Sequence, residues 1–321
     1  MDINLNNEIA KFLYADIDPE QAFHKQHPLL AHYTSMQNLE NILRENQLWF
    51  SNPLYMNDLQ EVIVGMKAGY QIFASSAELQ TACGSREQFE KLLSYWIELH
   101  RQFEDQHLVD TYILSTSLHE LKDNDGKLSM WRGYGGNGKG AAIVFDTAQL
   151  NLNADSPLII SKVDYITDSQ RQEWLIDRVA NLAGLLSGKV LDDDDLQSVA
   201  YQFFIRLQLF SLLTKHKGFE EEKEWRVVYM PEKDTQGLLK TMISYINSAK
   251  GLEPKLKFNV QPLKGLTVED FSLSKIVDRI IIGPSHSSPF ALAMMKRMLL
   301  KHGKPELENR VFSSKIPFRF K

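Results

Sequence analysis

The segment that decides the fold is FEEEKEWRVVYM, residues 219–230. Its first half is acidic, and its second half, from Trp225 onward, is rich in residues with high β propensity. Because side chains alternate along a strand, Glu222, Glu224 and Arg226 are expected on one face and Trp225 on the other, buried face. Burying a carboxylate at the start of a strand costs free energy unless the carboxylate is paired with a cation or has a functional role. The segment therefore predicts a functional site; the alternative is a solvated edge strand with an ion pair.

Composition places the chain among ordinary globular proteins. It has 321 residues, of which 43% are hydrophobic and 24% charged, enough for a sizeable core. The net charge of −5 gives no overall attraction to nucleic acid or anionic membranes. Cys83 is the single cysteine, so no intrachain disulfide can form. The sequence shows no secretory signal and no apolar run long enough to span a bilayer. We therefore expect a cytoplasmic protein without a membrane partner.

Hydrophobic periodicity predicts one α+β domain over residues 1–321, with a helical insertion at about 168–217. Strands are predicted at residues 28–34, 48–51, 111–115, 141–145, 158–165, 225–229, 255–260, 277–284 and 310–314. Helices are predicted at residues 1–14, 36–43, 61–73, 87–103, 236–248 and 289–302. Within the insertion, the acidic run at 192–195 is expected to place negative charge at a helix N-terminus. A metal site there is the alternative, with no partner ligand visible.

The glycine-rich segment GYGGNGKG, residues 133–140, nearly matches a phosphate-binding P-loop. Gly140 stands where that motif needs a hydroxyl residue for magnesium. The segment also leads into the strand at 141–145, whereas a P-loop leads into a helix N-terminus. We interpret it as a flexible glycine turn.

A metal-dependent nuclease is an alternative reading of the acidic segment. Glu221 and Lys223, together with Asp146 at the end of an earlier strand, resemble the acidic–lysine arrangement of such enzymes. Paired carboxylates can hold magnesium for phosphodiester cleavage. Against this reading, Lys223 is expected to point away from Glu222 and Glu224.

Two clusters of polar and aromatic residues admit both structural and functional interpretations. His32 lies within a strand, where a histidine is usually structural, but Tyr33 and Thr34 follow it just before a helix N-terminus. Such a position can receive a ribose or a phosphate. Trp131 and Tyr134 can pack on a helix face, or they can stack on a ligand ring.

Taken in order, these segments resemble a bacterial family of unknown function, DUF2971. The matching segments are HYTS at 32–35, LWF at 48–50 with Asn57-Asp58 after it, STS at 115–117, WRGYG at 131–135, residues 140–146, FEEEKEWR at 219–226, IIIGP at 280–284 and SSKIP at 313–317. The resemblance covers residues 28–319.

That family is similar to the ADP-ribosyltransferases, which implies a split β-sheet core. In those enzymes a histidine or arginine on the first core strand, a serine or aromatic residue on a middle strand and a glutamate near a late strand hold NAD. Carried over by position, the first is His32, the middle one is Ser117 or its neighbour Ser115, and the last is Glu224. Glu222, two residues earlier, resembles the loop motif that precedes the catalytic acid. The motif STS does not fix which hydroxyl is meant, and the helical stretch at 168–217 separates the second motif from the third.

The resemblance implies an NAD-dependent ADP-ribosyltransferase or NAD glycohydrolase, as in a toxin or an antiphage effector. Cleavage of the nicotinamide–ribose bond creates positive charge on the sugar, which a fixed carboxylate stabilises. The implied catalytic residues are Glu224, Glu222 and His32, and the implied NAD contacts are His32, Tyr33, Thr34, Asn57, Ser115, Ser117, Trp131, Arg132 and Tyr134. No metal is expected, and the acceptor is open: protein, nucleic acid, a small molecule or water. The other alternative is a catalytically silent nucleotide-binding or interaction module.

Overall fold

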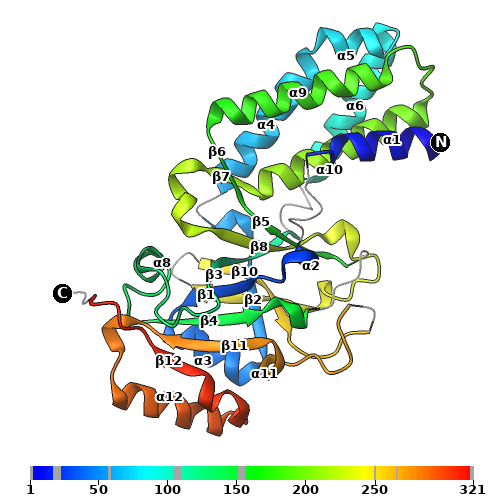
Figure 1. The fold of residues 1–321 in the computed structure, drawn as a ribbon. Coiled ribbons are helices and arrows are strands. Elements are labelled where there is room, and N and C mark those ends of the chain that lie inside the picture. Colours follow the sequence, from blue (N-terminus) through cyan, green and yellow to red (C-terminus); the bar gives the residue numbers. More distant parts are fainter. Residues whose placement is uncertain are drawn as a thin grey trace. The chain divides into compact units, whose positions relative to one another are not determined.

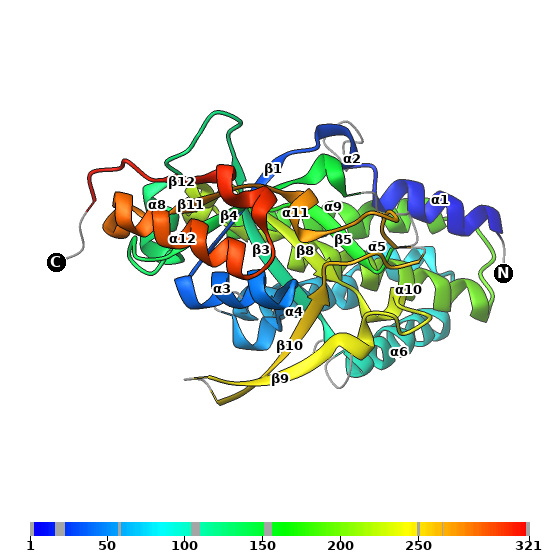
Figure 2. The ribbon, with the colours of Figure 1, turned by 90° about the horizontal axis from the view of Figure 1, so that it is seen from below.

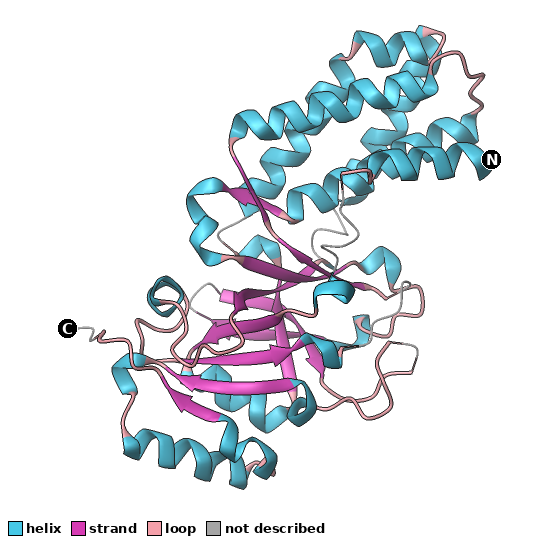
Figure 3. Ribbon diagram, in the orientation of Figure 1, coloured by secondary structure: helices cyan, strands magenta, loops and turns pink. Residues whose placement is uncertain are grey.

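The chain forms two compact units in the computed structural model, which describes residues 3–16, 23–56, 59–103, 110–150, 156–248, 251–264 and 266–318. The first unit comprises Met1–Gln21, Pro53–Asp110 and Val163–Phe219, and the second comprises Ala22–Asn52, Thr111–Lys162 and Glu220–Lys321. The first is built mainly of helices and the second contains the large sheet (Figure 3). The helical part is larger than the predicted insertion at 168–217, because it also includes residues 53–110.

The helices of the first unit pack against one another (Figure 1). Aromatic rings form part of the core between them. The helices are α1 (Ile3–Leu13), α4 (Leu59–Ser75), α5 (Ala77–Ala82), α6 (Arg86–Gln102), α9 (Asp168–Leu186) and α10 (Asp193–Leu212). Two short strands, β6 (Asp164–Ile166) and β7 (Thr214–His216), pair in parallel. Trp96 of α6 lies 5.1 Å, between ring centroids, from Phe73 of α4 and 5.7 Å from Phe203 of α10. These buried rings join α4 and α6 to α10, which is far from them in the sequence.

The acidic run at 192–195 caps α10, as predicted. The side chain of Asp192 accepts a hydrogen bond from the backbone N–H of Asp195, and the side chain of Asp195 accepts one from the backbone N–H of Asp192. This reciprocal arrangement satisfies N–H groups that a helix start leaves open and places negative charge at the positive end of the helix dipole.

The second unit contains a mixed, ten-stranded sheet among the described residues. Its strands are β1 (Leu29–Thr34), β2 (Gln47–Ser51), β3 (Tyr112–His119), β4 (Ala141–Asp146), β5 (Leu158–Lys162), β8 (Glu224–Tyr229), β9 (Ile243–Ser248), β10 (Gly251–Asn259), β11 (Val277–Ile282) and β12 (Val311–Ser313). The order is β12-β11-β4-β1-β3-β2-β10-β9, with β8 beside β3 and β5 beside β8. Strands β11 and β12 pair in parallel across α12 (Pro289–Lys301), whereas the other pairs are antiparallel. This mixed sheet with helices confirms the α+β class.

Helices cover both faces of this sheet. The α-helices of the second unit are α2 (Phe23–Gln26), α3 (Met36–Glu45), α8 (Leu128–Gly133), α11 (Leu273–Ile276) and α12. Short 3-10 turns lie at Pro53–Tyr55, Thr147–Gln149, Lys217–Glu222, Pro231–Lys233, Lys240–Met242, Pro284–His286 and Pro305–Arg310. On one face, Ile143 of β4 packs in a core with Leu43 of α3 and Leu299 of α12. On the other face, Val144 packs with Trp131 of α8.

The predicted helix at 236–248 is wrong. Residues 243–248 form β9, which pairs with β10 as a hairpin at the edge of the sheet (Figure 2). The β-branched and aromatic residues Ile243, Tyr245 and Ile246 favour a strand, and the pairing with β10 satisfies its backbone. The strand predicted at 158–165 is divided in two, because β5 ends at Lys162 and β6 begins at Asp164.

The sheet splits along one side of β3. Strand β8 borders β3 from Tyr112 to Ser117. On the other side, β1 pairs with β3 only at Ser117–His119, and β2 pairs with it at Ile113. Ser115, between these two points, has no strand partner on that side among the described residues. The split in this sheet therefore lies between β1 and β2, at Ser115.

Candidate functional site

Strand β8 is a buried interior strand, so the alternative of a solvated edge strand is wrong, although the ion pair exists. Glu224 and Arg226 share one face, as predicted, and are 5% and 1% exposed. The guanidinium contacts the carboxylate twice, with Nε 2.9 Å from Oε1 and Nη2 3.2 Å from Oε2. Trp225 lies on the opposite face and is buried, which confirms the prediction for it. The carboxylate of Glu224 thus forms an ion pair with a buried cation.

Glu222 does not continue the strand face of Glu224, contrary to the prediction. It ends a 3-10 turn, and the next residue, Lys223, has a left-handed backbone with φ of 44°. The alternation of β8 begins only at Glu224. Glu222 instead reaches Tyr134, whose hydroxyl donates to Oε1 at 2.9 Å. Because Tyr134 is 47% exposed, this carboxylate lies against a side chain that reaches the surface.

Both serines of the predicted motif lie on the face of β3 that carries Glu224. Ser117 pairs with Glu224 across the ladder, and Ser115 pairs with Arg226. The Ser117 hydroxyl donates to the backbone oxygen of Glu222 at 2.6 Å and accepts from Nζ of Lys127 at 2.9 Å. The Ser115 hydroxyl is buried and has no hydrogen-bond partner among the described residues. A buried hydroxyl without a partner is unfavourable, and a ligand at the split could supply one.

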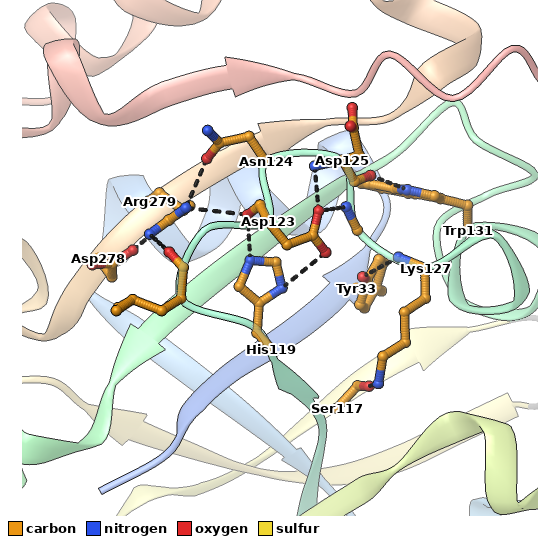
Figure 4. A network of polar contacts seen from close by, with 12 residues as sticks. Tyr33, Ser117, His119, Asp123, Asn124, Asp125, Lys127, Trp131, Asp278 and Arg279 are labelled. Carbon is orange, nitrogen blue, oxygen red and sulfur yellow. Dashed lines mark hydrogen bonds and ion pairs between the residues drawn. The ribbon is translucent and has the colours of Figure 1, made fainter.

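A loop held by several hydrogen bonds places Lys127 beside Ser117, and the sequence analysis did not identify this lysine (Figure 4). The carboxylate of Asp123 accepts from the backbone N–H groups of Asp125 and Gly126, and its backbone oxygen contacts the ring of His119 at 2.8 Å. Arg279 donates hydrogen bonds to the backbone oxygens of Leu121 and Asp123 in the same loop. Lys127 is the first cation after the polar loop at 122–126, which is the one signal that could have identified it.

The electrostatics at Lys127 are unusual for a lysine. Partial burial and, to a smaller degree, the nearby charge of Lys223 lower the pKa of Lys127 to about 8. Glu120 and Asp123 oppose this shift. Because the charges of Lys127 and Lys223 repel each other, an anion bound near both would stabilise their charged forms.

His32 does not lie on the face of the sheet that carries Glu224, although the resemblance implies that both residues hold NAD. Ala31 pairs with Ser117, which pairs with Glu224, so alternation puts His32 on the other face. Its ring instead lies at the edge of the split, with Nδ1 3.0 Å from the backbone oxygen of Ser115. A carbonyl only accepts, so Nδ1 carries the hydrogen and Nε2 is the acceptor in the neutral ring. Burial lowers the pKa of His32 and favours this neutral form.

Of the other predicted NAD contacts, Tyr33 and Trp131 have structural roles, whereas Arg132 is exposed. The Tyr33 hydroxyl accepts from the backbone N–H of Lys127, its ring meets that of Trp131 edge-on at 4.8 Å, and burial raises its pKa to about 12. Trp131 is 0% exposed and donates to the backbone oxygen of Asp125, so it is a packing residue and is closed to stacking on a ligand. Arg132 is exposed and lies over the ring of Phe318.

Thr34 and Asn57 are two further predicted NAD contacts. Thr34 is buried at the end of β1, opposite Ala141 of β4. Asn57 lies outside the described residues. In the glycine segment, Gly133 ends α8 and residues 134–140 turn from α8 into β4, with positive φ at residues 136–138.

The arrangement needed by a nuclease is not formed. Asp146 ends β4, and β1 and β3 lie between β4 and β8. At about 4.8 Å per strand, Asp146 and the start of β8 are roughly 14 Å apart, too far to share one metal ion. Across the described ranges, no group of three or more His, Cys, Asp or Glu side chains is placed to hold a metal. None of the helices in those ranges is both long and apolar enough to cross a membrane.

Comparison with known proteins gives a family match over part of the chain. The model described as "Protein of unknown function (DUF2971)" matches residues 130–227, less than a third of the sequence. Resemblance to this family is thereby confirmed over α8, β4, β5, α9, α10 and the first residues of β8. The matched part contains Trp131, Arg132, Tyr134, Glu222 and Glu224. No curated protein and no solved structure matches the chain.

Proposed function

We propose that the split in the sheet of the second unit binds NAD and that the protein cleaves the nicotinamide–ribose bond, passing ADP-ribose to an acceptor or to water. The supporting observation is that three motifs far apart in the sequence lie on three adjoining strands. Ser117 of β3 pairs with Ala31, next to His32, on one side and with Glu224 on the other. A resemblance to ADP-ribosyltransferases requires this convergence, which chain order alone does not guarantee.

Glu222 is the carboxylate that we assign to the reaction. As the glycosidic bond breaks, its electron pair leaves with nicotinamide and positive charge develops on the ribose. A fixed carboxylate lowers the energy of that state. Glu224 is less suited, because a bidentate contact with Arg226 already neutralises its charge. The half-exposed Tyr134 orients Glu222 through its hydroxyl and can wall the pocket with its ring.

The groups around the split suit the rest of a dinucleotide. Nε2 of His32 has no hydrogen-bond partner among the described residues and, as an acceptor, can receive a bond from a ribose hydroxyl. Lys127 and Lys223 offer positive charge to the diphosphate. His32 is off the face of Glu224, so we place the nucleotide in the split itself, where β1 leaves β3, rather than on one face of the sheet.

The test combines NAD binding by calorimetry with nicotinamide release by chromatography. We expect Glu222→Gln to lower turnover by roughly two orders of magnitude, the loss typical of one preorganised electrostatic group, with a much smaller change in NAD affinity. Tyr134→Phe keeps the ring and should cause a smaller loss. Glu221→Gln is the matched control, because Glu221 is the exposed neighbour in the sequence and should keep wild-type activity.

Each other outcome selects an alternative. Wild-type protein that binds NAD without releasing nicotinamide would be the silent module. Full activity in Glu222→Gln would remove it as the stabilising carboxylate. Wild-type protein that fails to bind NAD would refute the proposed function.

A further inference from the structure

One buried arginine of the first unit has no carboxylate partner among the described residues. Arg171 of α9 and Arg206 of α10 are each 6% exposed, and Arg226 of the second unit is 1% exposed. Arg206 and Arg226 each form an ion pair with a carboxylate, whereas Arg171 forms none with any described residue. A guanidinium stays charged in a protein, so burying it without an anion costs free energy. Arg171 therefore carries a positive charge that the described residues do not balance.

The hydrogen bonds of Arg171 are also incomplete. Its Nη1 donates to the hydroxyl of Thr214 at 3.4 Å, which is a long contact with a neutral group. That hydroxyl donates its own hydrogen to the backbone oxygen of Phe210. Nε of Arg171 is buried and has no hydrogen-bond partner among the described residues. The guanidinium thus presents an unused N–H group inside the helical unit.

A second unpartnered group lies beside the same guanidinium. Helix α4 contacts both α9 and α10 (Figure 1). A Cβ placed on Gly65 of α4 would lie 2.5 Å from Oγ of Ser211 on α10 and 3.3 Å from Nη1 of Arg171. Ser211 is 0% exposed, and its hydroxyl has no hydrogen-bond partner among the described residues. The two groups therefore meet at the point where α4 carries no side chain.

Gln208 lacks partners one turn earlier on α10. Residues three apart lie on the same side of a helix, so the side chains of Gln208 and Ser211 leave α10 next to each other. Gln208 is 0% exposed, and neither its amide nitrogen nor its amide oxygen has a partner among the described residues. Leaving a buried polar group unpaired is unfavourable. Three such residues on facing helices, one of them charged, indicate a bound anion.

We propose that an anion site lies between α4, α9 and α10 at Arg171 and that it takes chloride. The ion accepts hydrogen bonds from Nε of Arg171 and from the hydroxyl of Ser211, and its charge offsets that of the guanidinium. A water molecule could accept the same bonds but would leave the charge unbalanced. Because the side chains that form the site are at most 6% exposed, the site favours a single-atom ion over a larger oxyanion. The site belongs to the helical unit and is independent of the proposed NAD chemistry.

The first test is the dependence of stability on chloride. Urea titrations of the full chain are followed by circular dichroism at constant ionic strength, with gluconate as the replacing anion. For one site present only in the folded protein, each tenfold rise in chloride above its Kd should lower the unfolding equilibrium constant about tenfold. Arg86→Met, at an exposed arginine of α6, is the control and should keep the full chloride response.

Two variants of the site separate anion binding from a structural role. Arg171→Met should abolish the chloride response and, in gluconate, should be at least as stable as the wild-type protein, because a buried unpaired charge is removed. Ser211→Ala should weaken chloride binding several-fold, although it removes a hydroxyl that has no partner among the described residues. Equal stability of the wild-type protein in chloride and gluconate would overturn the proposal. So would a full chloride response in Arg171→Met or in Ser211→Ala.

Crystallography with bromide in place of chloride locates the ion directly. We expect an anomalous peak within hydrogen-bond distance of Nε of Arg171 and Oγ of Ser211. Density for water at that point, without an anomalous signal, would overturn the proposal. A bromide peak without any chloride-dependent stability would be an adventitious ion only and would overturn it as well.

Discussion

Replacing Arg226 by methionine tests how the buried pair on β8 is stabilised. Arg226 and Glu224 are 1% and 5% exposed and share two contacts, of 2.9 and 3.2 Å. Methionine retains most of the volume, so the main effect is the loss of the cation beside a buried carboxylate. Removing one partner of such a pair typically costs about 3–5 kcal/mol. We expect Arg226→Met to lower the free energy of unfolding by that amount in urea titrations followed by circular dichroism.

The double variant separates the lost charge pair from lost packing. With Glu224 also replaced by methionine, no carboxylate remains unneutralised at this point of β8, and most of the lost stability should return. Arg86→Met is the control, because Arg86 pairs with Glu90 at 2.8 Å with both side chains largely exposed, and its effect should be hard to detect. An Arg226→Met variant as stable as Arg86→Met would refute the reasoning. The outcome also decides whether inactivity in a Glu224 variant reflects chemistry or unfolding.

Three further predictions concern single side chains. Trp225→Ala should lower the free energy of unfolding by roughly 3–5 kcal/mol, the usual cost for a buried aromatic, and an unchanged urea midpoint would contradict the face assignment. Amine labelling of Lys127, followed by mass spectrometry across pH, should rise with a midpoint near its pKa of about 8, and Lys223→Gln should move that midpoint upward. Burial lowers the pKa of His32 in the folded state, so the unfolded chain binds more protons between that pKa and the ordinary value of about 6.5. Its contribution to stability is therefore lost as pH falls below about 6.5, and wild-type protein should lose more stability than His32→Gln between pH 7 and pH 5.

Local sequence signals were sufficient to predict the structure wherever a residue type has one strongly preferred structural role. Ser35 caps α3, and the acidic run caps α10, because these side chains satisfy the open N–H groups of a helix start. The alternation of side chains in β8 was enough to predict that Trp225 is buried and that Glu224 pairs with Arg226. Apart from β9, which was predicted as a helix, the strands of the split sheet were predicted with shifts only at their ends, since apolar runs set their positions.

The geometry of the site could not be predicted, because it depends on features that the spacing of residues in the sequence does not reveal. The left-handed backbone at Lys223 is unusual for a residue other than glycine, and it turns Glu222 away from the strand face toward Tyr134. The position of Lys127 follows from the hydrogen bonds of the Asp123 loop, which lies in a polar segment without periodicity. Only the folded chain brings these residues together.

The split accounts for the position of His32, which lies off the face of the sheet that carries Glu224. If β1 continued along β3, the backbone oxygen of Ser115 would be satisfied by a strand and His32 would point into a closed sheet. Because β1 leaves after Ala31, the imidazole takes over that bond, and the carbonyl fixes the hydrogen on Nδ1. The same contact that makes His32 structural therefore leaves Nε2 as an acceptor at the opening. A histidine in a strand can thus hold the sheet and still meet a ribose hydroxyl, so the structural and functional interpretations of His32 are compatible.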